Sequence, residues 1–166
     1  PYVQARRAEL LARDGNDGYG TPRQEAFWQH ALTADDQLRQ RMAFALSQIF
    51  VVSQLGGLDG DHEAVTRYYD MLIGHAFGNY RDLLEDVTLS PVMGTYLSMI
   101  RNRKPDWDTG HEPDENYARE IMQLFSIGLV ELHPDGSVKR DAEGKPIPTY
   151  TQDDIVGLAR VFTGLS

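Results

Sequence analysis

Helix start signals recur along this chain and constrain its fold more than any other feature. Thr21 precedes Pro22 and Gln24, which gives a threonine N-cap, a proline at the first helical position and a glutamine at the third. Thr33 and Thr151 are each followed, two positions on, by a pair of acids that suit the start of a helix dipole. Further N-caps are predicted at Asp61, Asn79 and Ser90. Together these signals predict helices over 2–13, 22–32, 34–55, 61–77, 79–88, 90–101, 114–128 and 152–163.

The helix predicted over 34–55 is strongly apolar. From Met42 to Val52 only Ser47 and Gln48 are polar, so almost every face of this stretch is hydrophobic. A helix that is hydrophobic on all faces is normally surrounded by other elements. We therefore expect it to be the central helix of the fold.

One stretch departs from the helical pattern. Residues 130–133 and 145–150 flank a turn-rich segment that contains Pro134-Asp135-Gly136 and Glu143-Gly144. Prolines in the second flank keep it from joining a larger sheet, so a short hairpin or ordered loop is predicted. The expected fold is mainly α, a multi-helix array of about seven to eight helices with this one excursion near 130–150. We expect residues 1–166 to form a single helical domain.

Composition excludes several classes of partner and chemistry. The net charge of −9 opposes nucleic-acid binding, which depends on cation–phosphate contacts. There is no cysteine, so disulfides, thiolate metal sites and a cysteine nucleophile are excluded. The longest apolar run, Met42 to Val52, is too short to span a bilayer. The chain starts at Pro1 without a methionine, and we expect it to be part of a longer protein, cytoplasmic or exported, onto which the remainder of that protein packs.

The segment 115–128, here called the signature segment, concentrates polar groups at the start of an amphipathic helix. It begins Glu115-Asn116-Tyr117-Ala118-Arg119-Glu120 and continues as Ile121-Met122-Gln123-Leu124-Phe125-Ser126-Ile127-Gly128. Tyr150-Thr151-Gln152-Asp153-Asp154 and Ala159-Arg160-Val161-Phe162-Thr163-Gly164 follow in order. The three elements together resemble the bacterial domain-of-unknown-function-1800 family. That resemblance implies no particular reaction, because the family has no assigned chemistry.

The polar residues of the signature segment allow two interpretations. Glu115 and Arg119 stand four apart with the acid first, the favourable order for a helical pair. In a structural interpretation, such a pair is a polar clamp between neighbouring helices. In a catalytic one, Glu120 acts as a general base assisted by Glu115, while Arg119 and Asn116 bind an anionic or polar substrate.

Other residues join these candidates. Arg160 and Tyr117 are further candidates for substrate binding. Arg160, from the last motif, is expected on a helix that packs against the signature helix, and Tyr117 lies on the apolar stripe of the signature helix. Trp107 stands in a polar loop just before the signature segment, where it could act as a lid or stack on a sugar. His111 is a second candidate for substrate binding, and with Glu112, Asp114 and Glu115 it offers a weak metal-ligand set. No cofactor and no metal site is predicted.

We therefore favour a helical structural or binding module whose partner is a protein or a small polar ligand. The alternative is a hydrolase-like enzyme that uses Glu120. The exposure of the signature's polar atoms discriminates between the two, because groups that line a water-filled cleft favour the enzyme and groups satisfied by the fold favour the clamp.

Overall fold

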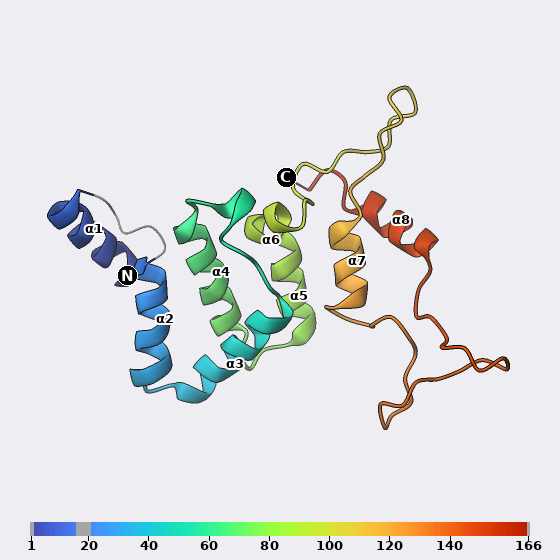
Figure 1. The fold of residues 1–166 in the computed structure, drawn as a ribbon, viewed down its shortest axis with the longest axis horizontal. Helices are drawn as coiled ribbons and strands as arrows, with labels where there is room; N and C mark the ends of the chain where they lie inside the picture. Colours follow the sequence, from blue (N-terminus) through green and yellow to red (C-terminus); the bar gives the residue numbers. More distant parts are fainter. Residues whose placement is uncertain (1, 16–20, 166) are drawn as a thin grey trace. The chain divides into compact units, whose positions relative to one another are not determined.

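The computed structural model describes residues 2–15 and 21–165 and is mainly α, as predicted. Over these residues it contains eight α-helices and one short 3₁₀ helix, with no extended sheet. The chain divides into two compact units, Pro1–Val92 and Met93–Ser166 (Figure 1). No helix in the described residues is long and apolar enough to cross a membrane. The single domain over 1–166 stays a prediction.

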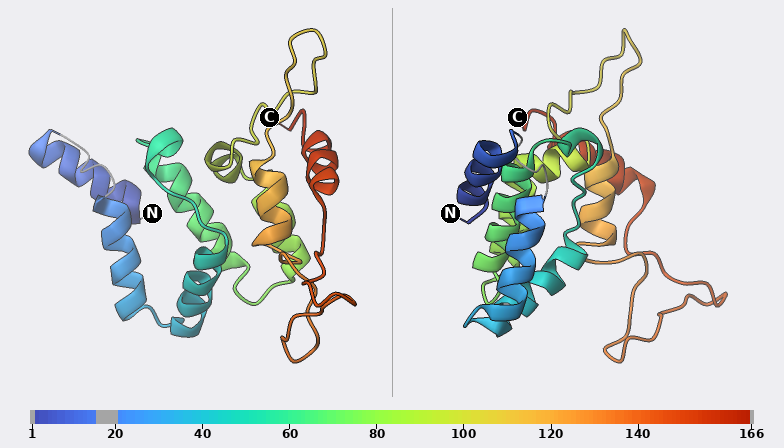
Figure 2. Two further views of the ribbon diagram at one scale, coloured as in Figure 1. Left: turned by 45° about the vertical axis from the view of Figure 1, so that its right-hand side comes forward. Right: turned by 60° about the vertical axis from the view of Figure 1, so that its left-hand side comes forward.

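The first unit is a run of consecutive helices. α1 packs on α2, α2 on α3 and α3 on α4 (Figures 1 and 2). A short connection joins α2 to α3, whereas a longer one that contains η1 joins α3 to α4. Helix α6 crosses the boundary between the units. The bounds of the elements are α1 Tyr2–Asp14, α2 Thr21–Thr33, α3 Gln37–Ile49, η1 Gly56–Leu58, α4 His62–Gly74, α5 Tyr80–Leu89 and α6 Pro91–Tyr96.

The core of the first unit follows the helical period. Val65, Tyr68 and Leu72 recur on one face of α4 and are buried. Leu83 and Val87 stand four apart on α5 and are buried in the same way. Burying aliphatic side chains of this kind contributes about 1.5–3 kcal/mol each relative to exposure, so these periodic faces stabilise the unit.

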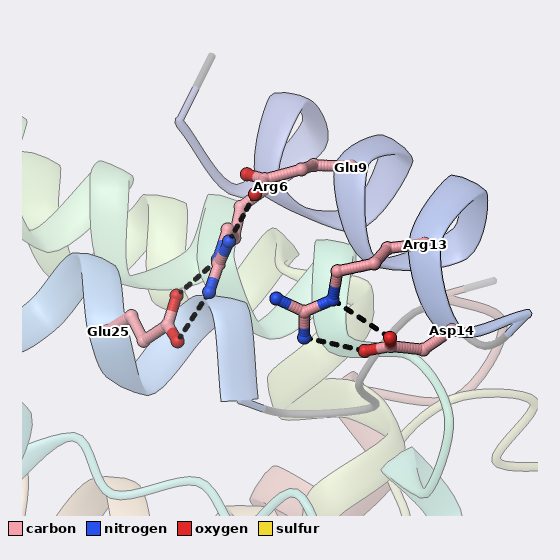
Figure 3. A network of polar contacts seen from close by, with 5 residues as sticks. All are labelled: Arg6, Glu9, Arg13, Asp14 and Glu25. Carbon is pink, nitrogen blue, oxygen red and sulfur yellow. Dashed lines mark hydrogen bonds and ion pairs between the residues drawn. The ribbon is translucent and has the colours of Figure 1, made fainter.

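Ion pairs connect α1 to α2 on the surface of the first unit (Figure 3). Arg6 bonds Glu25 of α2 at 2.9 Å and Glu9 of its own helix at 2.8 Å. These two acids raise the pKa of the Arg6 guanidinium. Arg13 pairs with the adjacent Asp14 at 2.6 Å. Exposed pairs of this kind are worth little individually, so they orient α1 more than they stabilise it.

The helix predicted over 34–55 is shorter than expected and is not enclosed. α2 ends at Thr33, whose hydroxyl donates to the Gln29 carbonyl, and Asp36 takes the N-cap position of α3. At the other end Phe50 leaves helical geometry, with φ −90° and ψ 61°, and buries its ring completely. The Phe50 carbonyl then accepts from the Tyr68 hydroxyl at 3.0 Å.

The expectation that α3 is surrounded on all faces is wrong. Leu38, Met42, Phe44 and Ile49 are all exposed, with Leu38 at 68%. In this unit α3 packs mainly on α2 and α4, which cover only part of its circumference. The apolar composition of this helix therefore does not mean that other elements cover all of its faces.

The predicted caps have mixed outcomes. Asn79 accepts from the Arg81 backbone at 2.8 Å, and Thr151 and Asp154 form a complete capping box. Asp61 takes the N-cap position of α4 without a side-chain hydrogen bond. Thr33 is not a cap, because its hydroxyl is already committed to the preceding helix.

The second unit contains α7 (Asn116–Gln123) and α8 (Gln152–Val161), which pack on each other. The helix predicted over 90–101 ends at Tyr96, because Ser98 and Arg101 both adopt φ of 59°. The helix predicted over 114–128 ends at Gln123. There the Phe125 amide reaches back five residues to the Glu120 carbonyl at 3.0 Å and opens the turn.

Residues 129–149 form the predicted non-helical excursion, as three short extended segments. A closed cycle of backbone bonds joins them: Glu131 donates to Ile147 at 2.9 Å, Ile147 to Lys139 at 3.1 Å and Lys139 to Glu131 at 2.9 Å. Isolated bridges connect Val130 with Pro148, Leu132 with Val138 and Arg140 with Pro146. Each segment therefore pairs with both others, which is a more closed arrangement than a simple hairpin.

Candidate functional site

The signature segment is positioned by the packing of α7 against α8. On α8 the capping box of Thr151 fixes the helix start, and Ile155, Ala159 and Phe162 recur on its buried face. On α7 Tyr117 is buried, and its ring contacts that of Phe162 edge-on at 5.1 Å. The predicted apolar position of Tyr117 is thus a packing position, and it holds the polar face of α7 beside the first turn of α8.

Three polar side chains meet at this junction in a cluster here called the polar triangle: Glu115, Arg119 and Gln152. One Glu115 carboxylate oxygen, Oε2, accepts from an Arg119 terminal nitrogen at 2.9 Å and from Gln152 Nε2 at 2.8 Å. The same Arg119 nitrogen approaches Gln152 Oε1 at 3.5 Å. The side chains of Arg119 and Glu115 are 40% and 34% exposed, so the triangle lies at the surface and is not a buried ion pair.

Glu120 lies outside the triangle. Its Oε2 is buried and has no hydrogen-bond partner among the described residues. Asn116, predicted to help bind a substrate, is exposed at the first residue of α7, where its backbone amide donates to Asp114 Oδ1 at 2.8 Å. The two residues therefore differ in environment, and the structure does not place Glu120 within the Glu115–Arg119 contact.

Asn102 is a central residue that sequence reasoning missed. Its side chain exchanges two hydrogen bonds with the backbone of Asp114, donating to the carbonyl at 3.0 Å and accepting from the amide at 2.9 Å. Its own carbonyl accepts from the Gly164 amide at 3.1 Å. Asn102 is buried, at 8% exposed, in a segment that the sequence assigned only as helix end. In the sequence, the one hint of the role of Asn102 is that it is uncharged and stands between two charged residues, Arg101 and Arg103.

The helix that carries Arg160 does pack on the signature helix. However, the contact made by Arg160 is to Glu112, at 3.8 Å between Nη2 and Oε2. Glu112 precedes the signature segment, and both side chains are about half exposed, at 49% and 55%. At this distance and exposure the pair contributes little to stability.

Trp107 and His111 belong to one tight turn before the signature segment. Asp106 and His111 exchange backbone hydrogen bonds at 2.9 and 3.1 Å, and Trp107 is the first of the four turn residues between them. The Trp107 side chain is 82% exposed. The Thr109 and Asp108 hydrogen bonds to the Asp106 carboxylate lower the pKa of Asp106. His111 Nε2 is buried without a hydrogen-bond partner among the described residues.

Among the described residues, no three histidine, aspartate or glutamate side chains gather where they could hold a metal ion. The carboxylates of the predicted set are instead dispersed over other contacts: Glu112 with Arg160, Asp114 with the Asn116 amide and Glu115 with Gln152. What the junction offers chemically is one carboxylate, one guanidinium and one amide, arranged to bond one another.

Comparison with known proteins gives one match. The model of the family described as "Protein of unknown function (DUF1800)" matches residues 9–166, nearly the whole chain. No curated protein and no solved structure matches.

Proposed function

The chain belongs to the DUF1800 family of proteins of unknown function, and on that premise we propose that it is a helical structural or binding module in which the signature segment joins two helices. One observation carries the proposal: Glu115 Oε2 accepts from both Arg119 and Gln152, at 2.9 and 2.8 Å. Glu115 and Arg119 of the signature segment bond each other, and Glu115 also bonds Gln152 of α8 across the α7–α8 junction. Groups already committed in this way are suited to fixing helix packing.

The polar triangle is partly exposed, and this exposure limits how much it can contribute to the free energy of unfolding. Exposed or half-exposed pairs contribute about 0.2–1 kcal/mol, whereas losing one partner of a fully buried pair costs about 3–5 kcal/mol. The signature therefore acts as an orienting contact on α7 and α8, and the apolar contact of Tyr117 with Phe162 supplies more of the energy.

A double-mutant cycle tests this role. Glu115→Ala, Gln152→Ala and the double variant are compared by urea unfolding, and a coupling of about 0.5–1 kcal/mol is expected. Asp153→Ala in place of Gln152→Ala is the matched control, because Asp153 is the exposed neighbour and no contact of its side chain with Glu115 is present. A coupling no larger than that of the control would show that the signature does not hold the two helices together.

The alternative function, a hydrolase-like enzyme, rests on Glu120. Its Oε2 is buried without a partner among the described residues, an arrangement that costs stability and is common where a carboxylate is kept for chemistry. Hydrolysis of chromogenic esters, glycosides and phosphate esters by the parent chain is the test, with Glu120→Gln as the variant. Turnover that Glu120→Gln abolishes, with folding intact by circular dichroism, would favour the enzyme.

A further inference from the structure

A large cavity with an aromatic wall lies within the first unit. Its volume is about 1520 Å³, and it is lined by residues of α1, α2, α3 and α4. Phe27 forms the centre of the wall. The centroid of its ring lies 5.2 Å from that of Trp28, 6.0 Å from that of Phe44 and 5.9 Å from that of Tyr69. Trp28 and Phe44 are 61% and 47% exposed. Large aromatic side chains exposed together are typical of an interaction surface.

The cavity is large enough to hold a short helix. Taking a helix as about 10 Å wide with a rise of about 1.5 Å per residue, a volume of 1520 Å³ corresponds to a cylinder about 19 Å long, or about 13 residues. The four long helices around the cavity, α1 to α4, have 13 residues each. Sites for small molecules are smaller, about 300–1,000 Å³. The size therefore favours a polypeptide occupant.

One cationic group on the wall lacks an acid. Arg23 lines the cavity from α2, and its terminal nitrogen donates to Gln54 Oε1 at 2.6 Å. Among the described residues the buried Arg23 Nε has no hydrogen-bond partner, and no carboxylate acts on the guanidinium. Burial lowers the pKa of the Arg23 guanidinium. A desolvated cation of this kind is destabilising alone, and a carboxylate bound by the guanidinium fork would satisfy it.

We propose that this cavity receives an amphipathic helix of about three and a half turns from a partner outside residues 1–166. Apolar side chains of that helix pack on Phe27, Trp28 and Phe44, and an aspartate or glutamate on it pairs with Arg23. The proposal concerns the first unit and is independent of the role of the signature segment in the second.

The test is a selection from a displayed library of 13-residue helical peptides whose apolar face and flanking positions are randomised. It is run in parallel on the parent chain and on Arg23→Glu. The parent is expected to enrich peptides with an acid at one fixed position, and Arg23→Glu to enrich peptides with a lysine or arginine there. Arg81→Glu is the matched control, because Arg81 is exposed on α5 and does not line the cavity. Selection on Arg81→Glu should enrich peptides with an acid at the same position as selection on the parent does.

Binding of the selected peptides is then measured by Trp28 fluorescence in a Trp107→Phe background. Arg23→Glu is expected to weaken the acid-bearing peptides at least tenfold, and Arg81→Glu to leave them unchanged. Circular dichroism checks that each variant folds, and Arg23→Met replaces Arg23→Glu if the latter does not.

Three results would overturn the proposal. The first is that no peptide family is enriched. The second is that enriched peptides keep the same charge on the parent and on Arg23→Glu. The third is that sedimentation shows a dimer that enriched peptides do not dissociate, which would assign the cavity to a second copy. Dodecanoate that changes Trp28 fluorescence while no peptide binds would assign it to a small amphiphile instead.

Discussion

The Asn102 side chain bonds both backbone groups of Asp114, at 3.0 Å to the carbonyl and 2.9 Å to the amide, and so imitates a strand partner. The Asn102 carbonyl also accepts from Gly164, so one buried residue connects the start of the signature segment with the end of α8. These contacts tie together segments that are 12 and 62 residues apart along the chain. Among the polar residues of the second unit, Asn102 is thus the one whose removal should matter most.

Asn102→Ala should destabilise the protein by about 1–3 kcal/mol, because it removes two hydrogen bonds that each contribute about 0.5–1.5 kcal/mol. Both bonds go from the buried Asn102 side chain to the backbone of Asp114. Urea unfolding monitored by circular dichroism measures the change. Asn116→Ala is the control, because Asn116 is exposed and the hydrogen bond it makes to Asp114 comes from its backbone. Equal effects of the two substitutions would contradict the role given to Asn102.

Much of the fold was predictable because local signals decide it. Asn79 and Thr151 start helices as predicted, and their caps depend only on residues two or three positions away. The excursion near 130–150 was recognisable for the same reason, from its prolines and turn residues. Helix ends were less predictable. Phe50 ends α3 where its ring is buried and its carbonyl accepts from Tyr68, a residue 18 positions away that no local pattern reveals.

The candidate site was predictable only in part. The Glu115–Arg119 contact follows from helical spacing alone. The third member, Gln152, comes from 37 positions away in the chain, so only the packing of α8 on α7 brings it there. Asn102 was missed because its partners are backbone atoms, which carry no sequence signal. The buried oxygen of Glu120 could not be foreseen either, since solvent exposure at one position of a half-buried helix depends on its neighbours.

Asp154 should make the stability of the second unit depend on pH in the acidic range. The Thr151 amide and hydroxyl donate to its Oδ2 at 2.8 and 2.7 Å, and these bonds lower the pKa of Asp154. Because its folded pKa lies below the unfolded value of about 3.9, the carboxylate stabilises the fold above about pH 4 and loses this effect as pH falls through the folded pKa. Thermal midpoints of the parent should therefore fall more steeply from pH 5 to pH 2 than those of Asp154→Asn.

Thr151→Val is the matched control for that measurement. It removes the hydroxyl but keeps the backbone amide, so one of the two donors to Asp154 remains. Its midpoints should show a pH slope between those of the parent and Asp154→Asn. Parallel curves for all three proteins would mean that the Asp154 carboxylate is not linked to folding.

Two glycines should respond in opposite directions to the same substitution. Gly157 lies inside α8, where a Cβ would meet no atom within 4 Å, so Gly157→Ala should stabilise by about 0.5–1 kcal/mol through helix propensity. Gly128 also has free space around it, but its φ is +75° and its amide closes the end of α7 on the Met122 carbonyl at 2.9 Å. Left-handed geometry costs an alanine about 1–2 kcal/mol, so Gly128→Ala should destabilise. A gain of about 2 °C in Tm for Gly157→Ala and a loss of about 3–4 °C for Gly128→Ala are expected by calorimetry. A change of the same sign in both would show that backbone conformation does not decide the outcome at these positions.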